Sequence, residues 1–352
     1  MPIYERFQRE GTKVHKKFIS RAAASMLVIG VSALGLAACS GSGSNTAQSV
    51  TLVTHDSFVW PKADKSAFEK ASGIKVKVVH AGDAGALTNK LILTADKPIG
   101  DLFYGIDNTF LGKAQAAGII AGSAHEADFG DVCVNYDKDW FAKSSPRIAP
   151  PTNWSDLTKP AYKGLTVVEN PATSSTGLAF AALTYAGQPA TDYEVKKGQY
   201  EDFWAAMKAN GVKVVAGWED AYYTDFSGSS GKGAYPIVIS YSTSPADEVR
   251  ANGESQTASL NDECFGQYEY VGALHKATNP AAASKVVQHL LGKEFQSTVA
   301  ESMYVYPVNQ DASLPEAWSK YTTKAKAHVG RDMNLSQVHD YLLAGFTKAV
   351  GN

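Results

Sequence analysis

The sequence lacks the short motifs by which common enzyme classes are recognised. It contains no Gly-x-Ser-x-Gly nucleophile turn, no phosphate loop ending in Gly-Lys-Ser or Gly-Lys-Thr, and no dinucleotide-binding glycine triplet after a strand. Its eight histidines are scattered, and none pairs with another at the spacing of a helical metal site. We therefore expect a protein that is not an enzyme and that has no catalytic residue, resident metal or cofactor.

The sequence also lacks an excess of charge of one sign. Its 33 lysines and arginines and 35 aspartates and glutamates give a net charge of -2, and no block of like charge occurs. Residues 1–38 carry a net charge of +4, which leaves the remainder near -6. Because binding to nucleic acid needs a basic face, this balance argues against a nucleic-acid partner.

Only one long apolar run is present, and it lies near the N-terminus. A basic segment precedes the uncharged residues 22–36, and the sequence Leu-Ala-Ala-Cys then ends at Cys39. Such a succession is typical of a secretory signal peptide, and the cysteine resembles that of the bacterial lipobox, in which the thiol receives a diacylglycerol. We predict a signal peptide over residues 1–38, lipidation of Cys39 and a flexible tether over residues 39–48. The alternative is a membrane-spanning anchor, although the run falls short of the roughly 20 residues that a spanning helix needs.

After Cys39 the chain has only two cysteines, Cys133 and Cys264. Two cysteines are too few for a typical metal site, and cysteine pairs in exported proteins are commonly oxidised. The sequence therefore predicts a disulfide between Cys133 and Cys264, and two buried free thiols are the alternative.

Strand and helix patterns alternate along the rest of the chain with short connections. Strands are predicted at 49–54, 74–79 and 101–106, each followed by a helical pattern. The alternation restarts after a Pro/Thr-rich passage at 146–152. This order predicts an α/β protein in which mostly parallel sheets are flanked by helices.

No linker separates two independent halves, so we expect two lobes joined by crossing hinge strands. The first lobe is expected to comprise residues 49–134 and 265–352, and the second lobe residues 135–264. Cys133 and Cys264 then fall at the two crossings, where paired strands can hold them within bonding range.

Short polar and aromatic side chains cluster where predicted strands end. Ligands of open α/β sheets bind beyond the carboxyl ends of the strands, which makes these turns candidate binding segments. No lysine or arginine occurs at 50–60 or 164–185, which favours a cationic or neutral ligand. The candidate segments are 55–60, 105–108, 170–177, 217–223 and 240–245, with a further aromatic segment at 303–307.

The ordered set of these segments resembles the thiamine-binding proteins of bacterial ABC importers, within a wider group that also contains ferric-ion binders. The resemblance covers nearly the whole chain after the signal peptide. It is carried by Thr54-x-Asp56-Ser57-Phe58, Gly105-x-Asp107-Asn108, Thr173-Ser174-Ser175-Thr176-Gly177-Leu178 and Gly217-Trp218-x-x-Ala221-Tyr222, and extended by residues 240–246 and by Tyr306-Pro307-Val308.

The resemblance implies a type II periplasmic-binding-protein fold and a transport function. On this interpretation the protein is a lipid-anchored monomer on the outer face of the cell membrane. It captures thiamine or a thiamine phosphate between its lobes and delivers it to an ABC permease with its ATPase subunits.

Thiamine carries a permanent thiazolium charge beside a flat aminopyrimidine ring, so its site needs aromatic faces and carboxylates. The family commonly has Trp where this chain has Tyr304, which stacks more weakly. The expected ligand-binding residues are the aromatic Trp60, Trp218, Tyr222, Tyr241 and Tyr304, the acidic Asp56, Asp107 and Asp220, and the small or neutral polar Ser57, Asn108, Ser174, Ser175, Thr176 and Gly177.

Other interpretations of these residues remain open. Ser174, Ser175 and Thr176 could hold a phosphate on backbone N–H groups at a helix start, or could simply cap that helix. The aromatic residues could instead be core residues, the usual place of Trp and Tyr. The tandem Tyr222-Tyr223 also fits a ferric-ion binder of the same architecture, because phenolates are suitable ligands for Fe(III).

Overall fold

The computed structural model describes residues 48–351, apart from 187–198, 230–232, 317, 323, 326–327, 331–332 and 334. The predicted signal peptide, Cys39 and nearly all of the predicted tether lie outside the described residues. Among the residues that are described, no helix is both long and apolar enough to cross a membrane.

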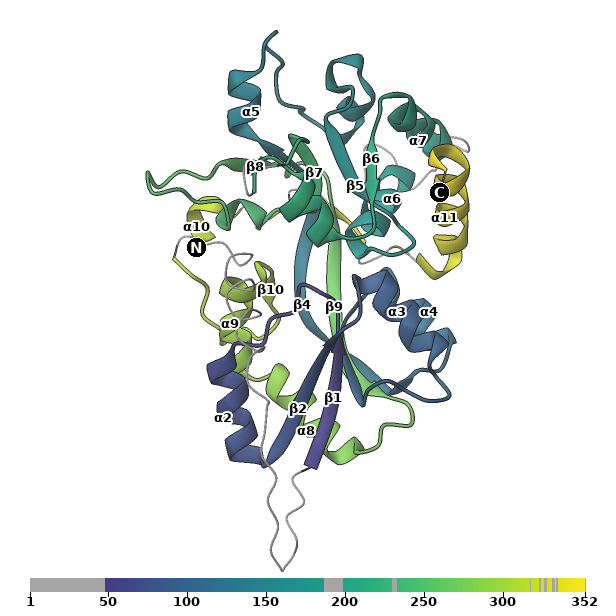
Figure 1. Ribbon diagram of the computed structural model, residues 1–352, viewed down its shortest axis with the longest axis vertical. Coiled ribbons are helices and arrows are strands. Elements are labelled where there is room, and N and C mark those ends of the chain that lie inside the picture. Colours follow the sequence, from purple (N-terminus) through teal and green to yellow (C-terminus); the bar gives the residue numbers. More distant parts are fainter. Residues whose placement is uncertain are drawn as a thin grey trace, which may run out of the picture. The chain divides into compact units, whose positions relative to one another are not determined.

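One mixed sheet connects two lobes (Figure 1). Its main strands follow the spatial order β2-β1-β3-β9-β4-β7-β5-β6. In chain order they are β1 (Gln48–Thr54), β2 (Ile74–His80), β3 (Leu102–Asp107), β4 (Ile120–Asp137), β5 (Thr166–Glu169), β6 (Lys213–Val215), β7 (Ile237–Tyr241) and β9 (Cys264–Leu274).

The first lobe is built on three parallel strands, in which β1 pairs with β2 on one side and with β3 on the other. β3 is buried along its whole length, as expected of a strand covered on both faces. An aromatic cluster that includes Phe58, Phe68 and Phe295 fills the core beside β1. The helices of this lobe are α2 (Lys62–Ser72), α3 (Ala84–Leu93), α4 (Leu111–Ala116), α8 (Pro280–Leu290) and α9 (Lys293–Met303).

The second lobe repeats this arrangement with β5 between β6 and β7, all parallel. Its central helix α6 (Ser175–Ala186) is buried at every residue except Tyr185, because its sequence is apolar or small all round. The other elements are α5 (Lys138–Lys143), α7 (Gln199–Ala209), a π-helix at Asp220–Asp225, 3-10 helices at Trp154–Thr158, Pro160–Tyr162 and Ser244–Ala246, and the short strand β8 (Thr257–Ser259).

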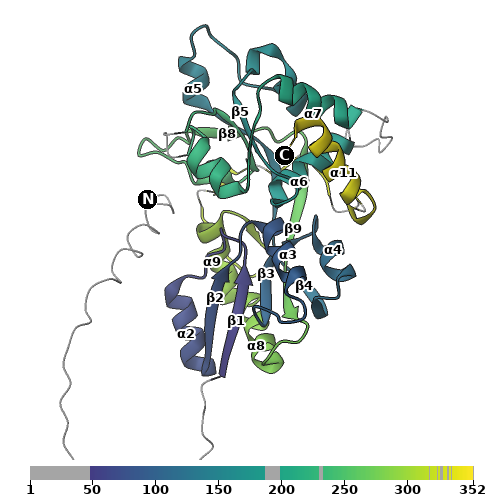
Figure 2. The same ribbon diagram turned by 45° about the vertical axis from the view of Figure 1, so that its right-hand side comes forward.

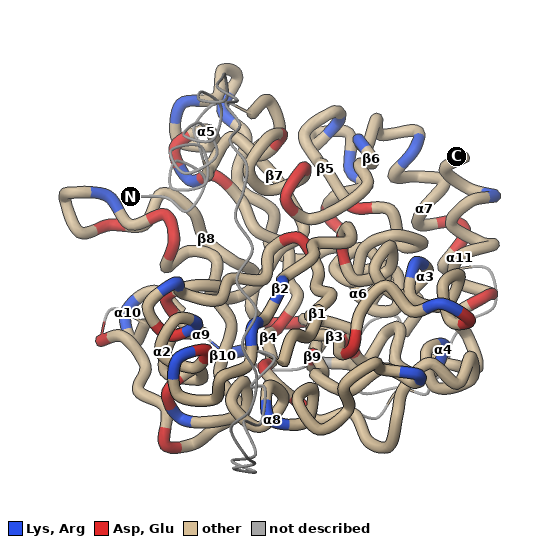
Figure 3. Tube along the Cα trace, turned by 60° about the horizontal axis from the view of Figure 1, so that its bottom comes forward, with Lys and Arg blue, Asp and Glu red and all other residues tan. Residues whose placement is uncertain are grey.

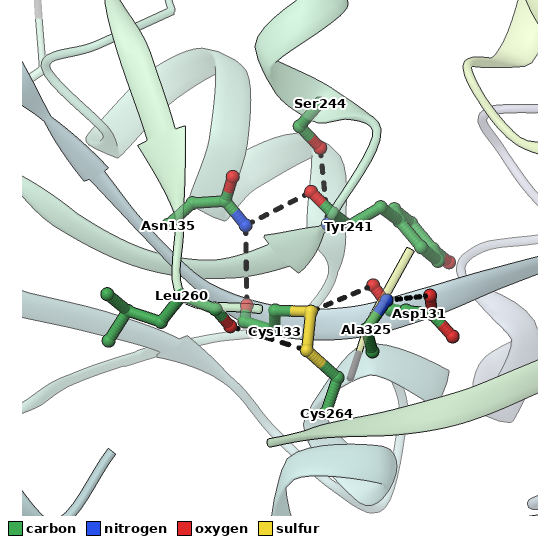
Figure 4. The surroundings of a disulfide bond; sticks show 8 residues. All are labelled: Asp131, Cys133, Asn135, Tyr241, Ser244, Leu260, Cys264 and Ala325. Carbon is green, nitrogen blue, oxygen red and sulfur yellow. Dashed lines mark hydrogen bonds between the residues drawn. A yellow bond between two sulfur atoms is a disulfide. The ribbon is translucent and has the colours of Figure 1, made fainter. Parts of the chain in front are cut away.

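The hinge consists of two long antiparallel strands, β4 and β9. β9 pairs with β3 of the first lobe, and β4 pairs with β7 of the second lobe. A disulfide joins Cys133 of β4 to Cys264 of β9, with the two Cα atoms 4.7 Å apart, and so confirms the predicted bridge. Figure 4 shows the bridge beside Asn135, whose side-chain amide donates to the carbonyls of Cys133 and Tyr241 at 3.3 and 3.2 Å. The disulfide therefore stiffens the hinge where it enters the second lobe.

The C-terminal segment departs from the expected lobe assignment. Helix α11 (Leu335–Val350) packs on α6 and α7 of the second lobe, beside which it lies in both Figures 1 and 2. The Tyr200 hydroxyl donates to the Leu342 carbonyl at 2.8 Å, and the rings of Trp204 and Phe346 lie 4.7 Å apart. We therefore propose that α11 belongs to the second lobe, whereas the sequence placed all of 265–352 in the first.

Three short elements precede α11. They are β10 (Tyr306–Pro307), which pairs with β4, α10 (Trp318–Tyr321), and β11 (His328–Val329), which pairs with β9. Acidic and basic residues are interspersed along the described chain, without a continuous block of one sign (Figure 3).

Candidate functional site

A small cavity lies between the two lobes. Its volume is about 30 Å³, room for roughly two water molecules. The first lobe and the hinge contribute charged side chains to its lining, namely His55, Asp83, Asp128 and Glu269. The second lobe contributes Ser175, Trp218 and Tyr241, and the remaining lining residues are Ser57, Met303 and Val305.

The second-lobe wall is aromatic. The ring of Trp218 stacks on that of Tyr222, with centroids 5.0 Å apart and planes 15° apart. Tyr241 lies edge-on to Trp218 at 6.2 Å. The Trp218 indole N–H donates to the Ser240 hydroxyl at 2.8 Å, so the ring is held both by stacking and by a hydrogen bond. Such a wall offers a flat aromatic face to a ring-shaped ligand.

The opposite wall is charged and buried. His55 Nε2 lies 3.1 Å from Glu269 Oε2, and both residues are less than a tenth exposed. Burial by itself lowers the pKa of His55, but the negative charges of Glu269, Asp128 and Asp83 outweigh it and raise the pKa to about 9. The imidazole is therefore positively charged at neutral pH and offsets part of the carboxylate charge.

Asp128 completes this charged wall at the centre of β4. The Tyr104 hydroxyl donates to its carboxylate. Burial and the nearby Glu269 raise the pKa of Asp128 well above its usual range. A raised pKa favours the protonated, neutral form of Asp128. The lining holds three acidic side chains, Asp83, Asp128 and Glu269, beside one imidazole, and it contains no lysine or arginine.

Gly105 makes room for the histidine of this wall. A Cβ at this position would lie 2.0 Å from His55 Cδ2, and the backbone φ of +97° is one that side-chain-bearing residues rarely adopt. The glycine that the sequence placed in a candidate binding turn thus supports the site through packing.

Four of the predicted site residues line the cavity: Ser57, Ser175, Trp218 and Tyr241. Tyr222 is fully buried behind Trp218 and donates to the Ser244 carbonyl at 3.3 Å. Ser174, Thr176 and Gly177 are buried at the start of α6, where the Ser174 hydroxyl lies 3.0 Å from that of Thr176 and accepts the Gly177 N–H at 3.4 Å. These residues support the lining from behind, which agrees with a capping role for the motif.

Two predicted acidic and polar residues at the end of β3 lie deeper. Asp107 is fully buried and accepts the Thr109 hydroxyl at 2.8 Å. Burial raises its pKa to about 8, with a contribution from the charge of Glu269. Asn108 exchanges hydrogen bonds with the backbone of β9, donating to the Gly266 carbonyl at 3.1 Å and accepting the Tyr268 N–H at 3.0 Å. Asn108 therefore fastens β3 to the hinge.

The remaining predicted residues lie away from the cavity lining. Trp60 packs in the first-lobe core, where its indole N–H donates to Asp64 at 2.7 Å. Asp56 is exposed and accepts the Gly82 N–H at 2.9 Å, and Asp220 is exposed. Tyr304 is not a lining residue, although its chain neighbours Met303 and Val305 are; its carbonyl accepts the Thr243 hydroxyl, and its own hydroxyl hydrogen-bonds to Asp247.

None of the four charged lining residues was among the predicted ligand-binding residues, although His55 begins the candidate segment 55–60. His55 and Asp83 each follow a strand, β1 and β2, so the strand-end rule that selected the segment of His55 could also have found Asp83. Asp128 and Glu269 lie inside the hinge strands, where no local motif marks them. Their placement depends on how β4 and β9 pair.

The structure offers little to a ferric ion. Within the described ranges, no three His, Cys, Asp or Glu side chains form a group that could hold a metal ion. The phenol groups of the tandem tyrosines have other partners, since Tyr222 donates to the Ser244 carbonyl and Tyr223 donates to Asp247 at 3.2 Å.

Comparison with known protein families assigns this chain to one of them. A model of bacterial extracellular solute-binding proteins matches residues 119–326, more than half of the chain. The chain belongs to this family. This membership confirms the predicted group, and the family is named for extracellular solute binding.

Relatives of this solute-binding protein include two that are named for thiamine. It is 26% identical over 293 residues to the thiamine-binding periplasmic protein of Escherichia coli strain K12, covering 78% of this chain and 85% of the relative. The chain is also 28% identical over 294 residues to the thiamine-binding periplasmic protein of Brucella melitensis biotype 1, and the match covers 76% of this chain and 82% of the relative.

Solved structures confirm the predicted two-lobed fold. A periplasmic thiamin-binding protein matches with a TM-score of 0.75 at 23% identity, covering 88% of this chain and 98% of the other. The ferric-binding protein of Campylobacter jejuni matches with a TM-score of 0.64 at 15% identity, covering 85% and 99%. At these identities the likeness concerns the fold alone.

Proposed function

We propose that this solute-binding protein captures thiamine, or a thiamine phosphate, in the cleft between its lobes and delivers it to an ABC permease. The carrying observation is that an aromatic wall, Trp218 and Tyr241, faces a wall of acidic side chains, Asp83, Asp128 and Glu269. A flat ring stacks on the first wall, and a fixed positive charge is attracted by the second. The named function of the two relatives supports the same ligand.

The size of the cavity implies that the lobes move. A volume of about 30 Å³ is too small for a two-ring ligand. Entry therefore requires the lobes to separate about the hinge formed by β4 and β9, and closure then excludes water from the ligand. Water exclusion strengthens the attraction between the carboxylates and the ligand charge.

We further propose that residues 1–38 direct export and that a lipid on Cys39 holds the receptor at the outer face of the cell membrane. A tethered receptor has a high effective concentration beside its permease without a tight complex. Radiolabelled glycerol or fatty acid should be incorporated into the protein and should be absent from Cys39→Ala.

The proposed function is tested by titrating the purified protein with thiamine, following the binding by tryptophan fluorescence and by isothermal titration calorimetry. We expect saturable binding and quenching that is reduced in Trp218→Phe. Trp60→Phe is the matched control, because Trp60 lies in the first-lobe core, and it should retain the quenching. Saturable Fe(III) binding with a visible phenolate charge-transfer band, without thiamine binding, would instead establish the ferric alternative.

A further inference from the structure

The Asp83 side chain connects the two walls of the cleft. It caps helix α3 of the first lobe, where Oδ1 accepts the Ala84 N–H at 2.6 Å. Its other oxygen, Oδ2, accepts the Trp218 N–H of the second lobe at 2.8 Å, and the Ser174 hydroxyl of that lobe is a further partner. A single carboxylate is thus shared between a helix cap and the segment that carries the aromatic wall.

The backbones around this contact fit closely. The Ala86 N–H donates to the Thr173 carbonyl of the second lobe at 3.0 Å. A Cβ at Gly85 would lie 2.7 Å from the Thr173 carbonyl carbon, and one at Gly217 would lie 3.1 Å from Asp83 Cβ. The start of α3 therefore packs directly against the second lobe when the cleft is closed.

Opening of the cleft must break these contacts, because Asp83 and Trp218 belong to different lobes. The Trp218 N–H and the Ser174 hydroxyl both donate to the Asp83 carboxyl from the second lobe, so opening removes two of its hydrogen bonds. The bond to the Trp218 N–H also fixes the backbone that carries the indole. The closed arrangement therefore gains both a contact across the cleft and a defined position of the aromatic face.

We propose that Asp83 is a positioning residue that couples closure of the lobes to the placement of Trp218. This inference rests on the receptor function proposed above, since it assigns the device that retains the ligand in that cleft. Loss of the Asp83 carboxylate should favour the open form and so shorten the residence time of the ligand. This shortening should exceed what the loss of a helix cap alone would cause.

The test compares Asp83→Ala with Asn279→Ala in the full-length protein. Asn279 caps α8 of the first lobe, where its side chain accepts the Ala282 N–H at 3.2 Å. Both variants lose a helix cap and should lose similar thermal stability, but only Asp83 reaches across the cleft. Stopped-flow measurement should show thiamine dissociating at least tenfold faster from Asp83→Ala and less than twofold faster from Asn279→Ala. Asp83→Asn retains an acceptor oxygen and should be intermediate.

Equal dissociation rates for the two alanine variants would overturn the inference while leaving the proposed function intact. Absence of thiamine binding to the unaltered protein would instead contradict the proposed function. In that case small-angle X-ray scattering of the protein alone decides the inference. A larger radius of gyration for Asp83→Ala than for Asn279→Ala supports it, and equal radii refute it.

Discussion

The two walls of the cleft differ in chemistry and in origin. The second-lobe wall presents the rings of Trp218, which follows β6, and of Tyr241, the last residue of β7, and the two residues lie close to one another in the chain. The opposite wall presents His55, Asp128 and Glu269, which come from three strands or strand ends far apart in the chain. The second-lobe wall can therefore stack on a flat ring of the ligand, whereas the opposite wall can attract a charge on it.

This difference shows why one lobe alone cannot form the site. An isolated aromatic face binds flat ligands with little discrimination by charge, whereas carboxylates exposed to water attract a cation only weakly. Closure brings the two walls together in a water-poor space, where each contact is stronger. The hinge disulfide between Cys133 and Cys264 fixes the strands about which that closure occurs.

The largest effect is expected from weakening the charged wall with Glu269→Gln. This change replaces the carboxylate that faces His55 and lines the cavity with a neutral amide, and it removes the main charge that raises the pKa of His55. Truncation of one partner of a buried charge pair typically costs 2–5 kcal/mol, so we expect thiamine affinity to fall about 100-fold. Isothermal titration calorimetry measures the change.

The control for this prediction is Asp96→Asn, which removes an exposed carboxylate paired with Lys276. It should leave the affinity within about twofold, because solvent screens a charge at that position. If Glu269→Gln binds thiamine as tightly as the control, the charged wall does not act on the ligand.

A smaller effect is expected from the aromatic wall. Trp218→Ala removes the ring that stacks on Tyr222 and faces the cavity. A loss of about 1.4 kcal/mol or more of stacking and cation–π energy corresponds to at least a tenfold weaker affinity. Trp218→Phe should recover most of it. A tenfold loss in Trp60→Phe as well would mean that the effect comes from general destabilisation.

The last prediction concerns the fold and not the affinity for the ligand, namely the pH dependence of the stability that His55 contributes. The pKa of His55 rises from 6.5 to about 9 on folding. Its contribution to stability is therefore fully present below pH 6.5 and is lost as the pH rises through 9. The shift corresponds to at most about 3 kcal/mol.

Urea unfolding of the unaltered protein and of His55→Gln at pH 6 and pH 9.5 isolates this contribution. The stability difference between the two proteins should be larger at pH 6 than at pH 9.5. Asp107, whose pKa is raised to about 8, also makes the fold less stable at high pH, but it is present in both proteins and its contribution cancels. A difference that does not change with pH would show that His55 is neutral in the fold.

Local patterns of apolar and polar residues predicted most of the longer helices and strands, and β2 shows why. The alternation of Ile74, Lys75, Val76 and Lys77 places apolar side chains inward, and β2 is where the pattern indicates. A hinge strand was expected at Cys133, but the bounds of β4 were not predicted, because its pairing to β9 shifts register near His125 and Asp128 and interrupts any regular alternation.

The sequence by itself determined most of the longer helices and strands, the pairing of Cys133 with Cys264 as the expected disulfide, and the turn that carries Trp218. These features follow from local periodicity, composition and neighbouring residues. Only the tertiary structure decided that Trp60 is a core residue, that α11 lies against α7, and that His55, Asp128 and Glu269 share one wall. The reason is physical: whether a polar or aromatic side chain faces a core or a cleft depends on which strands pair and how two lobes meet, and neither is encoded in a short stretch of chain.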